Sequence, residues 1–315
     1  MFENILVPLD GSPVSEAALP YAEALASRTG AKLILVRAAH APVLAAARPA
    51  AQFAAIADVE EYLATLAAQM RERGFAVETG VPYGLSPAEW IVEEIALRHA
   101  DIVVMGTHDR AGLDHWLRGS VAEAVVSHAT VPVLLIRAAE GMRPVQHFDL
   151  RQPVFVVPLD GSELAEAALP AAIDLAKMLD GRLVLVGVLS EPGQPVIETW
   201  GIGSYASADH ARLEMDVQHY LASAVAQVEA DGLSVQWAVR QGDPAVEIAL
   251  TAQERNAAAV VMATHGRTGL ARTLMGSVAG KVLHNSASPV VVVRPAQLRG
   301  AEEPVPVHNL APAGA

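Results

Sequence analysis

Residues 7–12 read Val-Pro-Leu-Asp-Gly-Ser, and the same six residues return in the same order at 157–162. The match continues with Glu-Ala-Ala-Leu-Pro, which stands at 16–20 and again at 166–170. A later block, Gly-Ser-Val-Ala, stands at 119–122 and at 276–279, a spacing seven residues longer than that of the first block. A period of this length is too long for a solenoid, so the chain is a duplication of one domain, with a small insertion in the middle of the second copy.

Each copy alternates short β-branched runs with helical patterns. In the first copy we expect strands near 4–9, 32–38, 75–81, 101–106 and 131–137, and helices near 13–29, 52–73, 87–99 and 120–129. In the second copy we expect strands near 154–159, 182–189, 234–240, 258–264 and 289–294. Strands that alternate with helices predict a parallel sheet covered on both faces. The predicted fold class is therefore α/β, with two tandem Rossmann-like domains, each a five-stranded parallel sheet flanked by helices.

Domain boundaries follow from the same pattern. We expect one domain over 1–140, a second over 151–296, and a linker over 138–152 that carries Gly141 and Pro144. The tail over 297–315 is rich in Pro, Ala and Gly and has no periodic pattern, which predicts disorder. The segments after each second strand, 39–51 and 190–208, are long enough to be binding loops or flexible surface excursions.

Composition limits the function. A chain of 315 residues fits two domains of about 150 residues each. The formal net charge of −13 argues against nucleic-acid binding, because such proteins carry a basic footprint. The absence of cysteine excludes disulfides, thiolate metal sites and thiol catalysis. No signal-peptide pattern or membrane-length apolar stretch is present in the sequence, so we expect a cytoplasmic protein with no membrane partner.

Candidate site residues follow the first and fourth strands of each copy. Asp10 and Asp160 stand at the ends of the first strands, and the segments from Gly106 and Ala263 follow the fourth. If these strands are neighbours where the strand order reverses, all four elements face one ligand crevice. In the second copy a glycine-containing loop leads to Gly276-Ser277-Val278 at the start of a helix. Such a helix start offers backbone N–H groups and a positive dipole end to an anion.

Two interpretations of this loop stay open. Gly276 would let a phosphate approach the backbone, Ser277 as the N-cap could direct its hydroxyl to the same phosphate, and Arg267 could supply charge. Gly-Ser before a helix is also ordinary N-capping, and Ser120 with Glu123 forms a complete capping-box pattern that needs no ligand.

These blocks resemble the universal stress protein family. The resemblance rests on Pro-Leu-Asp after the first strand, Thr-His-Gly-Arg at 264–267, Gly-Ser at 119–120 and 276–277, and the closing strands that end in Arg137 and Arg294. It covers both halves of the chain and implies an adenine nucleotide alpha hydrolase-like fold. The ATP-binding branch of the family is described by Gly-x-x-Gly-x9-Gly-Ser/Thr.

The resemblance implies an adenine-nucleotide ligand, ATP with or without Mg²⁺. It places the aspartates near the adenine and ribose, the ends of the second strands and the methionines around the base, and the Gly-Ser-Val segments on phosphate. The candidate ligand-binding residues are Pro8, Asp10, Ala38, Met105, Gly106, Gly119, Ser120 and Val121 in the first copy, and Pro158, Asp160, Val188, Met262, Ala263, His265, Gly266, Arg267, Gly276, Ser277 and Val278 in the second.

Neither copy matches the ATP pattern completely. The first copy has Asp109 where the second glycine belongs, and the second copy has Ala263 in place of the first glycine. A carboxylate beside polyphosphate costs on the order of 1–4 kcal/mol, although a divalent cation could reverse the sign. Ala263 adds one methyl group, which a nucleotide could accommodate. The second copy is therefore the expected ATP site, and the first is weaker, altered or empty.

Three functions remain to be weighed. The leading one is a non-enzymatic, ATP-binding stress or regulatory module, with ATP turnover slow if it occurs. The alternative is a structural or partner-binding protein whose nucleotide sites have decayed. An adenylating enzyme is a third, but Leu9–Ser12 resembles the required Ser-Gly-Gly-x-Asp-Ser loop only faintly. His108 and His265 recur without a visible partner, which favours a structural or ribose-side role, and no sequence pattern indicates a metal site.

Assembly is predicted from the closing strands at 131–137 and 289–294. An exposed apolar edge strand is a liability unless it is paired. We expect the two halves to pair through these strands as a pseudo-dimer within one chain, and a further homodimer is compatible with the sequence.

Overall fold

The computed structural model describes residues 2–39, 49–82, 86–108, 121–138, 150–189, 210–266 and 275–298. The first repeat contains β1 (Asn4–Pro8), α1 (Pro13–Glu16), α2 (Leu19–Thr29), β2 (Lys32–Val36), α3 (Pro49–Glu72), β3 (Val77–Gly80), α4 (Pro87–Leu97), β4 (Ile102–His108), α5 (Val121–His128) and β5 (Val133–Ala138). The second repeat contains β6 (Val154–Pro158), α6 (Glu163–Glu166), α7 (Leu169–Leu179), β7 (Arg182–Leu189), α8 (His210–Ala230), β8 (Val235–Gln241), α9 (Pro244–Glu254), β9 (Ala259–Ala263), α10 (Ser277–Asn285) and β10 (Val290–Val293).

All ten strands form one sheet in the order β3-β2-β1-β4-β5-β10-β9-β6-β7-β8. Within each repeat the five strands are parallel, as the alternation of strands and helices predicted. Apolar residues of the strands alternate between two buried clusters, one on each face of the sheet. The helices α1–α3 and α6–α8 pack on one face, and α4, α5, α9 and α10 pack on the other. The predicted α/β fold class is confirmed.

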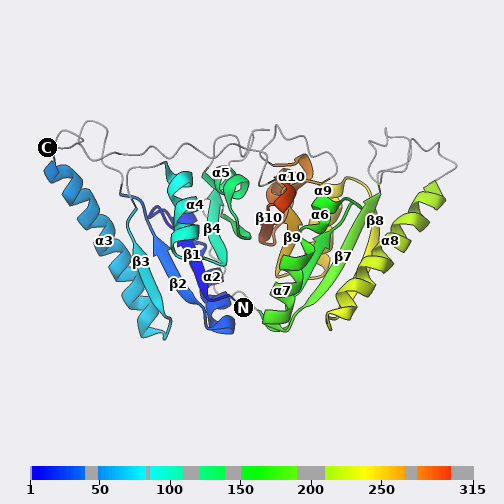
Figure 1. Ribbon diagram of the computed structural model, residues 1–315, viewed down its shortest axis with the longest axis horizontal. Coiled ribbons are helices and arrows are strands. Elements are labelled where there is room, and N and C mark those ends of the chain that lie inside the picture. The colour runs from blue at the N-terminus through cyan, green and yellow to red at the C-terminus, as the bar shows by residue number, and fades with distance from the viewer. Residues whose placement is uncertain are drawn as a thin grey trace.

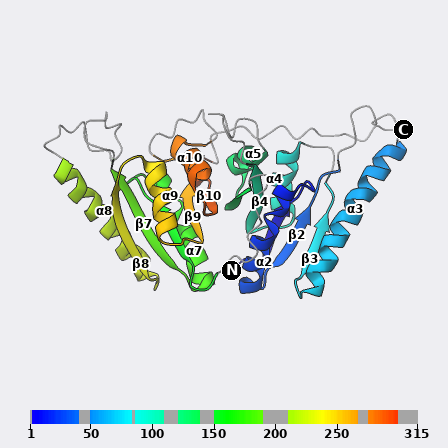
Figure 2. The same ribbon diagram turned by 180° about the vertical axis from the view of Figure 1, so that it is seen from behind.

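The two repeats meet through their last strands. β5 and β10 pair antiparallel, with Leu134 opposite Val291 at the centre of three paired positions. The expected pairing of the closing strands is therefore present, and it brings α5 and α10 to the middle of the molecule and leaves α3 and α8 at its two ends (Figure 1). At the lower middle of the view in Figure 2, α2 and α7 approach each other, and Arg28 Nη2 donates a hydrogen bond of 3.2 Å to the carbonyl oxygen of Leu179.

One expected helix is broken in the structure. Residues 13–29 were expected to form a single helix, but α1 ends at Glu16 and α2 begins at Leu19. Pro20 explains the break, because proline has no N–H to continue the hydrogen-bond ladder and its ring clashes with the carbonyl four residues earlier. Pro170 has the same effect between α6 and α7. The prediction of one continuous helix was wrong.

The start of the expected tail has a defined structure. Residues Ala296–Leu298 form a 3₁₀ helix, η3, and Arg294 Nη2 donates a hydrogen bond of 2.9 Å to the carbonyl oxygen of Leu298. Disorder beginning at 297 was therefore wrong for residues 297 and 298. The remainder of that tail, most of the linker, and most of the long segments after β2 and β7 lie outside the described residues.

Candidate functional site

The strand order reverses between β1 and β4 in the first repeat and between β6 and β9 in the second. β1 pairs with β2 on one side and β4 on the other, and β6 pairs with β7 and β9 in the same way. In open α/β sheets a ligand crevice lies beyond the carboxyl ends of the strands at such a point. The expectation that the first and fourth strands of each copy are neighbours is confirmed, and each repeat has one candidate crevice.

Both aspartates of these crevices stand in the same tight turn. Pro8 and Pro158 end the first strands of the repeats, and the turns that follow place Gly11 and Gly161 at φ +82° and +77°, values that favour glycine. In the second repeat Asp160 Oδ1 accepts hydrogen bonds from Ser162 N at 3.0 Å and Ser162 Oγ at 2.6 Å. Asp10 Oδ1 accepts the matching bond from the backbone N–H of Ser12 at 2.8 Å. The turn fixes each carboxylate just beyond the carboxyl end of the first strand of its repeat.

The loop after β9 lies directly against Asp160. A side chain on Gly266 would collide with Oδ2 of Asp160, so only a glycine fits there without displacing the carboxylate. Ten residues later the N–H of Gly276 donates a hydrogen bond of 2.8 Å to the carbonyl oxygen of Thr264. Asp160, Gly266 and the start of α10 are therefore brought together at the end of β9.

Helix α10 begins in a way that the sequence did not predict. Gly276 is the N-cap residue, with φ −65° and ψ 153°, and no side chain caps the helix. Ser277 is the first helical residue and is exposed. The expectation that Ser277 is the N-cap was wrong. The first N–H groups of an α-helix have no partner within the helix, so this start remains available to an acceptor such as phosphate.

Apolar candidates gather on the α9 and α10 face of the sheet. Val188, Met262 and Val278 belong to one hydrophobic cluster there, and Ala38 and Met105 belong to the same cluster in the first repeat. Val188 and Met262 are both 6% exposed. The residues expected around the adenine base therefore share one face of the sheet, and their contact with a base stays a prediction.

Gly106 and Ala263 lie on the opposite face. A side chain on Gly106 would collide with the backbone carbonyl oxygen of Val14 in α1. The methyl group of Ala263 packs in the cluster that also contains Ala165 of α6. The Ala263 methyl group therefore faces the short first helix of its repeat, and its contact with a nucleotide stays a prediction.

His265 is 9% exposed, and its Nδ1 lies 3.2 Å from Thr264 Oγ1. Its ring is also near Gly276, because a Cβ on that glycine would come within 3.9 Å of His265 Cδ2. The histidine therefore lies beside the start of α10.

Several candidates lie outside the described residues. They are Gly119, Ser120 and Arg267, together with Asp109 in the first copy's motif. Val121 begins α5 and is 38% exposed, and the side chain of His108 is not described.

Sequence reasoning missed a tyrosine–glutamate pair beside each crevice. Tyr62 of α3 donates a hydrogen bond of 2.8 Å to Glu16 Oε1, and Tyr220 of α8 donates one of 2.8 Å to Glu166 Oε1. Burial raises the pKa of both tyrosines, and the glutamate hydrogen bond raises it further. Both hydroxyls therefore stay protonated and act as donors. Both partners recur in the sequence, the glutamates within Glu-Ala-Ala-Leu-Pro and the tyrosines within Asp-Val-x-x-Tyr-Leu-Ala at 58–64 and 216–222. No local pattern, however, indicates that the two residues of a pair meet.

The described residues place a cation beside the first aspartate and none at the matching position of the second repeat. Arg37 follows β2, and its guanidinium lies 4.5 Å from the centre of the Tyr62 ring. A Cβ on Gly11 would come within 2.7 Å of Arg37 Nη1, so the guanidinium fills the space between that turn and the ring. The matching residue of the second repeat is Gly187, which has no side chain. The two crevices therefore differ in shape and charge beside their aspartates.

The described residues contain neither a candidate metal site nor a helix that could span a membrane. No group of three or more His, Cys, Asp or Glu residues there could hold a metal ion. No helix in this part of the chain has the length and apolar character needed to cross a membrane.

Comparison with known proteins gives a consistent result. The model of the universal stress protein family matches residues 1–137 and 154–294. A universal stress protein of Mycolicibacterium smegmatis is 29% identical over 303 residues, covering 93% of this chain and 97% of that protein. One of Methanocaldococcus jannaschii is 33% identical over 142 residues, covering 44% of this chain and 80% of that protein. The crystal structure of a universal stress protein from Archaeoglobus fulgidus covers 94% of this chain and 98% of its own, with a TM-score of 0.66 and 22% identity, which concerns the fold alone.

Proposed function

The chain belongs to the universal stress protein family, and from this premise we propose that it is an ATP-binding stress or regulatory module of the cytoplasm. Nucleotide binds mainly in the C-terminal repeat. ATP acts there as a bound ligand that stabilises the repeat or changes its associations, and we assign no catalytic residue.

One observation carries the choice of the C-terminal repeat. Gly266 lies against the Asp160 carboxylate, where any side chain would displace that group. The corresponding position of the first repeat is Asp109, which brings a second carboxylate into the same motif. Two like charges a few ångströms apart repel, and an anionic polyphosphate would add to this repulsion. The second crevice therefore suits a nucleotide better than the first.

Each part of a nucleotide has a matching group in the C-terminal repeat. Val188 and Met262 supply an apolar surface of the kind on which an adenine ring packs. Asp160 supplies an acceptor for ribose hydroxyl groups, with its orientation fixed by Ser162. The uncapped start of α10 supplies N–H groups and a positive dipole end for phosphate. The residues present therefore fit ATP.

ATP itself would supply a polyphosphate chain that can carry its own Mg²⁺. Magnesium is often held by one or two carboxylates together with substrate phosphates, so it needs no dedicated protein cage. Gly266 precedes α10 in the chain and lies against the Asp160 carboxylate, so Asp160 is the carboxylate that we place beside the phosphates. Its role in this proposal is to orient the nucleotide, and hydrolysis is at most slow.

A second candidate function is a partner-binding protein whose nucleotide sites have decayed. The packing around Gly106 favours this second function. A side chain at this position would collide with the Val14 carbonyl oxygen, so the glycine is required by packing and no ligand is needed to explain it. The glycines of the motif are therefore weaker support for a ligand than their spacing suggests.

Isothermal titration of the purified chain with ATP separates these functions. We expect one strong site, weakened in Asp160→Asn and unchanged in the matched Asp10→Asn variant. Asparagine keeps the oxygen that accepts the hydrogen bond from Ser162 N but removes the charge, so the turn is preserved. Removing a charged hydrogen-bond acceptor typically lowers affinity about tenfold or more. No nucleotide bound in native mass spectra, and no binding at millimolar ATP, would rule out the proposed function and favour the second candidate.

A further inference from the structure

The two ends of the ten-stranded sheet are protected to different degrees. β3 forms one end and β8 forms the other. An edge strand presents unpaired N–H and C=O groups to any chain that can pair with them, and proteins protect such edges with short strands and charged side chains. β3 has four residues and β8 has seven.

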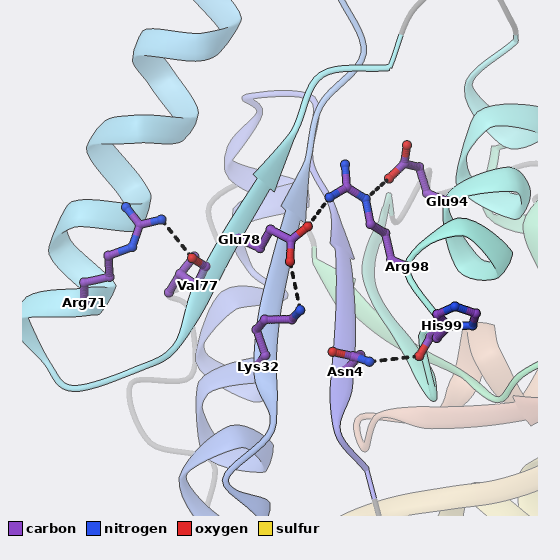
Figure 3. Close-up of polar contacts among 8 residues, drawn as sticks. All are labelled: Asn4, Lys32, Arg71, Val77, Glu78, Glu94, Arg98 and His99. Atoms are coloured by element: carbon purple, nitrogen blue, oxygen red, sulfur yellow. Dashed lines mark hydrogen bonds and ion pairs between the residues drawn. The ribbon is translucent and has the colours of Figure 1, made fainter.

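The edge of β3 carries two forms of protection (Figure 3). Arg71 of α3 donates a hydrogen bond of 2.8 Å to the outward carbonyl oxygen of Val77. Glu78 forms an ion pair of 2.8 Å with Lys32 and a second one with Arg98. A strand approaching this edge would have to displace the arginine and pass a group of charged side chains.

The edge of β8 lacks the first form, and in place of the second it has a different charged pair, Arg240 with Glu254. Glu229 stands in α8 where Arg71 stands in α3, and a glutamate cannot donate a hydrogen bond to the outward carbonyl of Val235. Gln236 replaces Glu78, and it accepts a hydrogen bond of 3.2 Å from Arg255. Trp237, in the middle of the strand, is 40% exposed. Within the described residues, β8 has β7 as its one strand partner.

The ladder to β7 defines which groups of β8 face outward. Leu183 N donates to the carbonyl oxygen of Ser234, and Gly242 N donates to that of Leu189. Because a parallel ladder uses alternate residues of each strand, the even-numbered residues bond to β7. The N–H and C=O groups of the odd-numbered residues therefore face outward, namely those of Val235, Trp237, Val239 and Gln241.

We propose that the edge of β8 pairs antiparallel with β8 of a second copy of this chain. With a two-fold axis at Ala238, all seven residues of each β8 strand are paired. The outward N–H and C=O groups of both strands then form hydrogen bonds with each other. Trp237 of one copy then stands opposite Val239 of the other, an aromatic and β-branched pair of a favourable kind. Gln236 stands opposite Arg240, so no like charges face each other. A strand that complements itself in this way meets the symmetry requirement of a homodimer.

Light scattering after size exclusion tests the pairing without nucleotide, so its outcome is independent of the proposed function. Between about 1 and 200 μM we expect the mass to rise from 33.0 kDa towards twice that value. Val239→Pro removes an outward N–H and leaves the ladder to β7 intact, so it should abolish the dimer. Thr79→Pro, the matched change at the edge of β3, should leave it unchanged. A wild-type monomer at every concentration, or a dimer that survives Val239→Pro, would overturn the proposal.

Cysteine cross-linking tests the register without relying on the proline variant. The chain contains no cysteine, so single-cysteine variants give an unambiguous result. Ala238→Cys faces its own copy across the two-fold axis and should form a covalent dimer on mild oxidation. Gln236→Cys stands opposite Arg240 and should not. Failure of Ala238→Cys to cross-link, or equal cross-linking of both variants, would contradict the register.

Discussion

The Asp160 carboxylate occupies the space that a side chain at Gly266 would need. One residue follows the first strand of the second repeat, and the other follows its fourth strand. Their contact joins two segments that lie more than a hundred residues apart in the sequence. A substitution at either residue is therefore expected to change the position of the other.

Gly266→Ala should weaken ATP binding in the second repeat, because the added methyl group displaces the Asp160 carboxylate from the position that Ser162 stabilises. We expect a loss of about tenfold in affinity, similar to the effect of Asp160→Asn. Titration calorimetry measures the affinity, and urea unfolding is the control, because a carboxylate can rotate away at small cost in stability. Unchanged affinity in a folded Gly266→Ala variant would show that this contact does not shape the nucleotide site.

Reciprocal changes at Gly106 and Ala263 should affect stability in opposite repeats. Gly106→Ala forces a methyl group against the Val14 carbonyl and should lower the free energy of unfolding by about 1–3 kcal/mol. Ala263→Gly removes a buried methyl group and adds backbone freedom, which costs about 1–2 kcal/mol. Denaturant unfolding measures both values. Ala263→Gly should leave ATP affinity unchanged, and a clear change would place residue 263 on the ligand side after all.

Tyr220→Phe should destabilise the chain by about 1–2 kcal/mol, because it leaves the Glu166 carboxylate without its donor. The pH dependence gives a second test. The folded pKa of Tyr220 is raised above its ordinary value of 10.0, so its contribution is fully present below pH 10 and is lost as the pH rises beyond it. Wild-type stability should therefore begin to fall near pH 10 and continue to fall above it, and the fall should be smaller in Tyr220→Phe. Tyr62→Phe is the matched variant in the first repeat, and equal slopes in all three proteins would contradict the assignment.

Glu78→Gln should show how much the charged group beside β3 contributes to stability. The hydrogen bond from Lys32 lowers the pKa of Glu78, and Arg98 lowers it further. The contribution is therefore present above the ordinary glutamate value of 4.5 and is lost as the pH falls below it. Because these side chains are partly exposed, we expect less than about 1 kcal/mol at pH 7. Unfolding of both proteins at neutral pH and near pH 3 measures the difference, which should be smaller in acid.

The sequence was sufficient for the architecture because the information is repeated within it. The block at 7–12 and its copy at 157–162 fix where each domain begins, and the apolar runs between them have the length of buried strands. The edge pairing of β5 with β10 was predictable for a similar reason, since both closing strands are apolar and would otherwise be exposed. Local features with a periodic signal were therefore predicted well.

Contacts between distant side chains were not predictable in this way. Nothing in the spacing of Tyr220 and Glu166 indicates that they meet, because their distance depends on how α8 packs on the sheet. The sequence also did not show why residue 106 is a glycine. A glycine that lets a helix backbone approach and one that lets a phosphate approach look the same in sequence. Ser277 was assigned to the N-cap by its residue type, but the helix begins one position earlier than that preference requires.

The joint between β5 and β10 has a consequence for how the halves can diverge. In a symmetric dimer of single domains, every substitution appears twice, and the subunits separate on dilution. Here three paired positions hold the halves together within one covalent chain, so their effective concentration does not depend on the amount of protein. Each half is then free to change alone, as Arg37 and Gly187 already illustrate. The fused chain can therefore hold two unequal domains in a fixed one-to-one ratio.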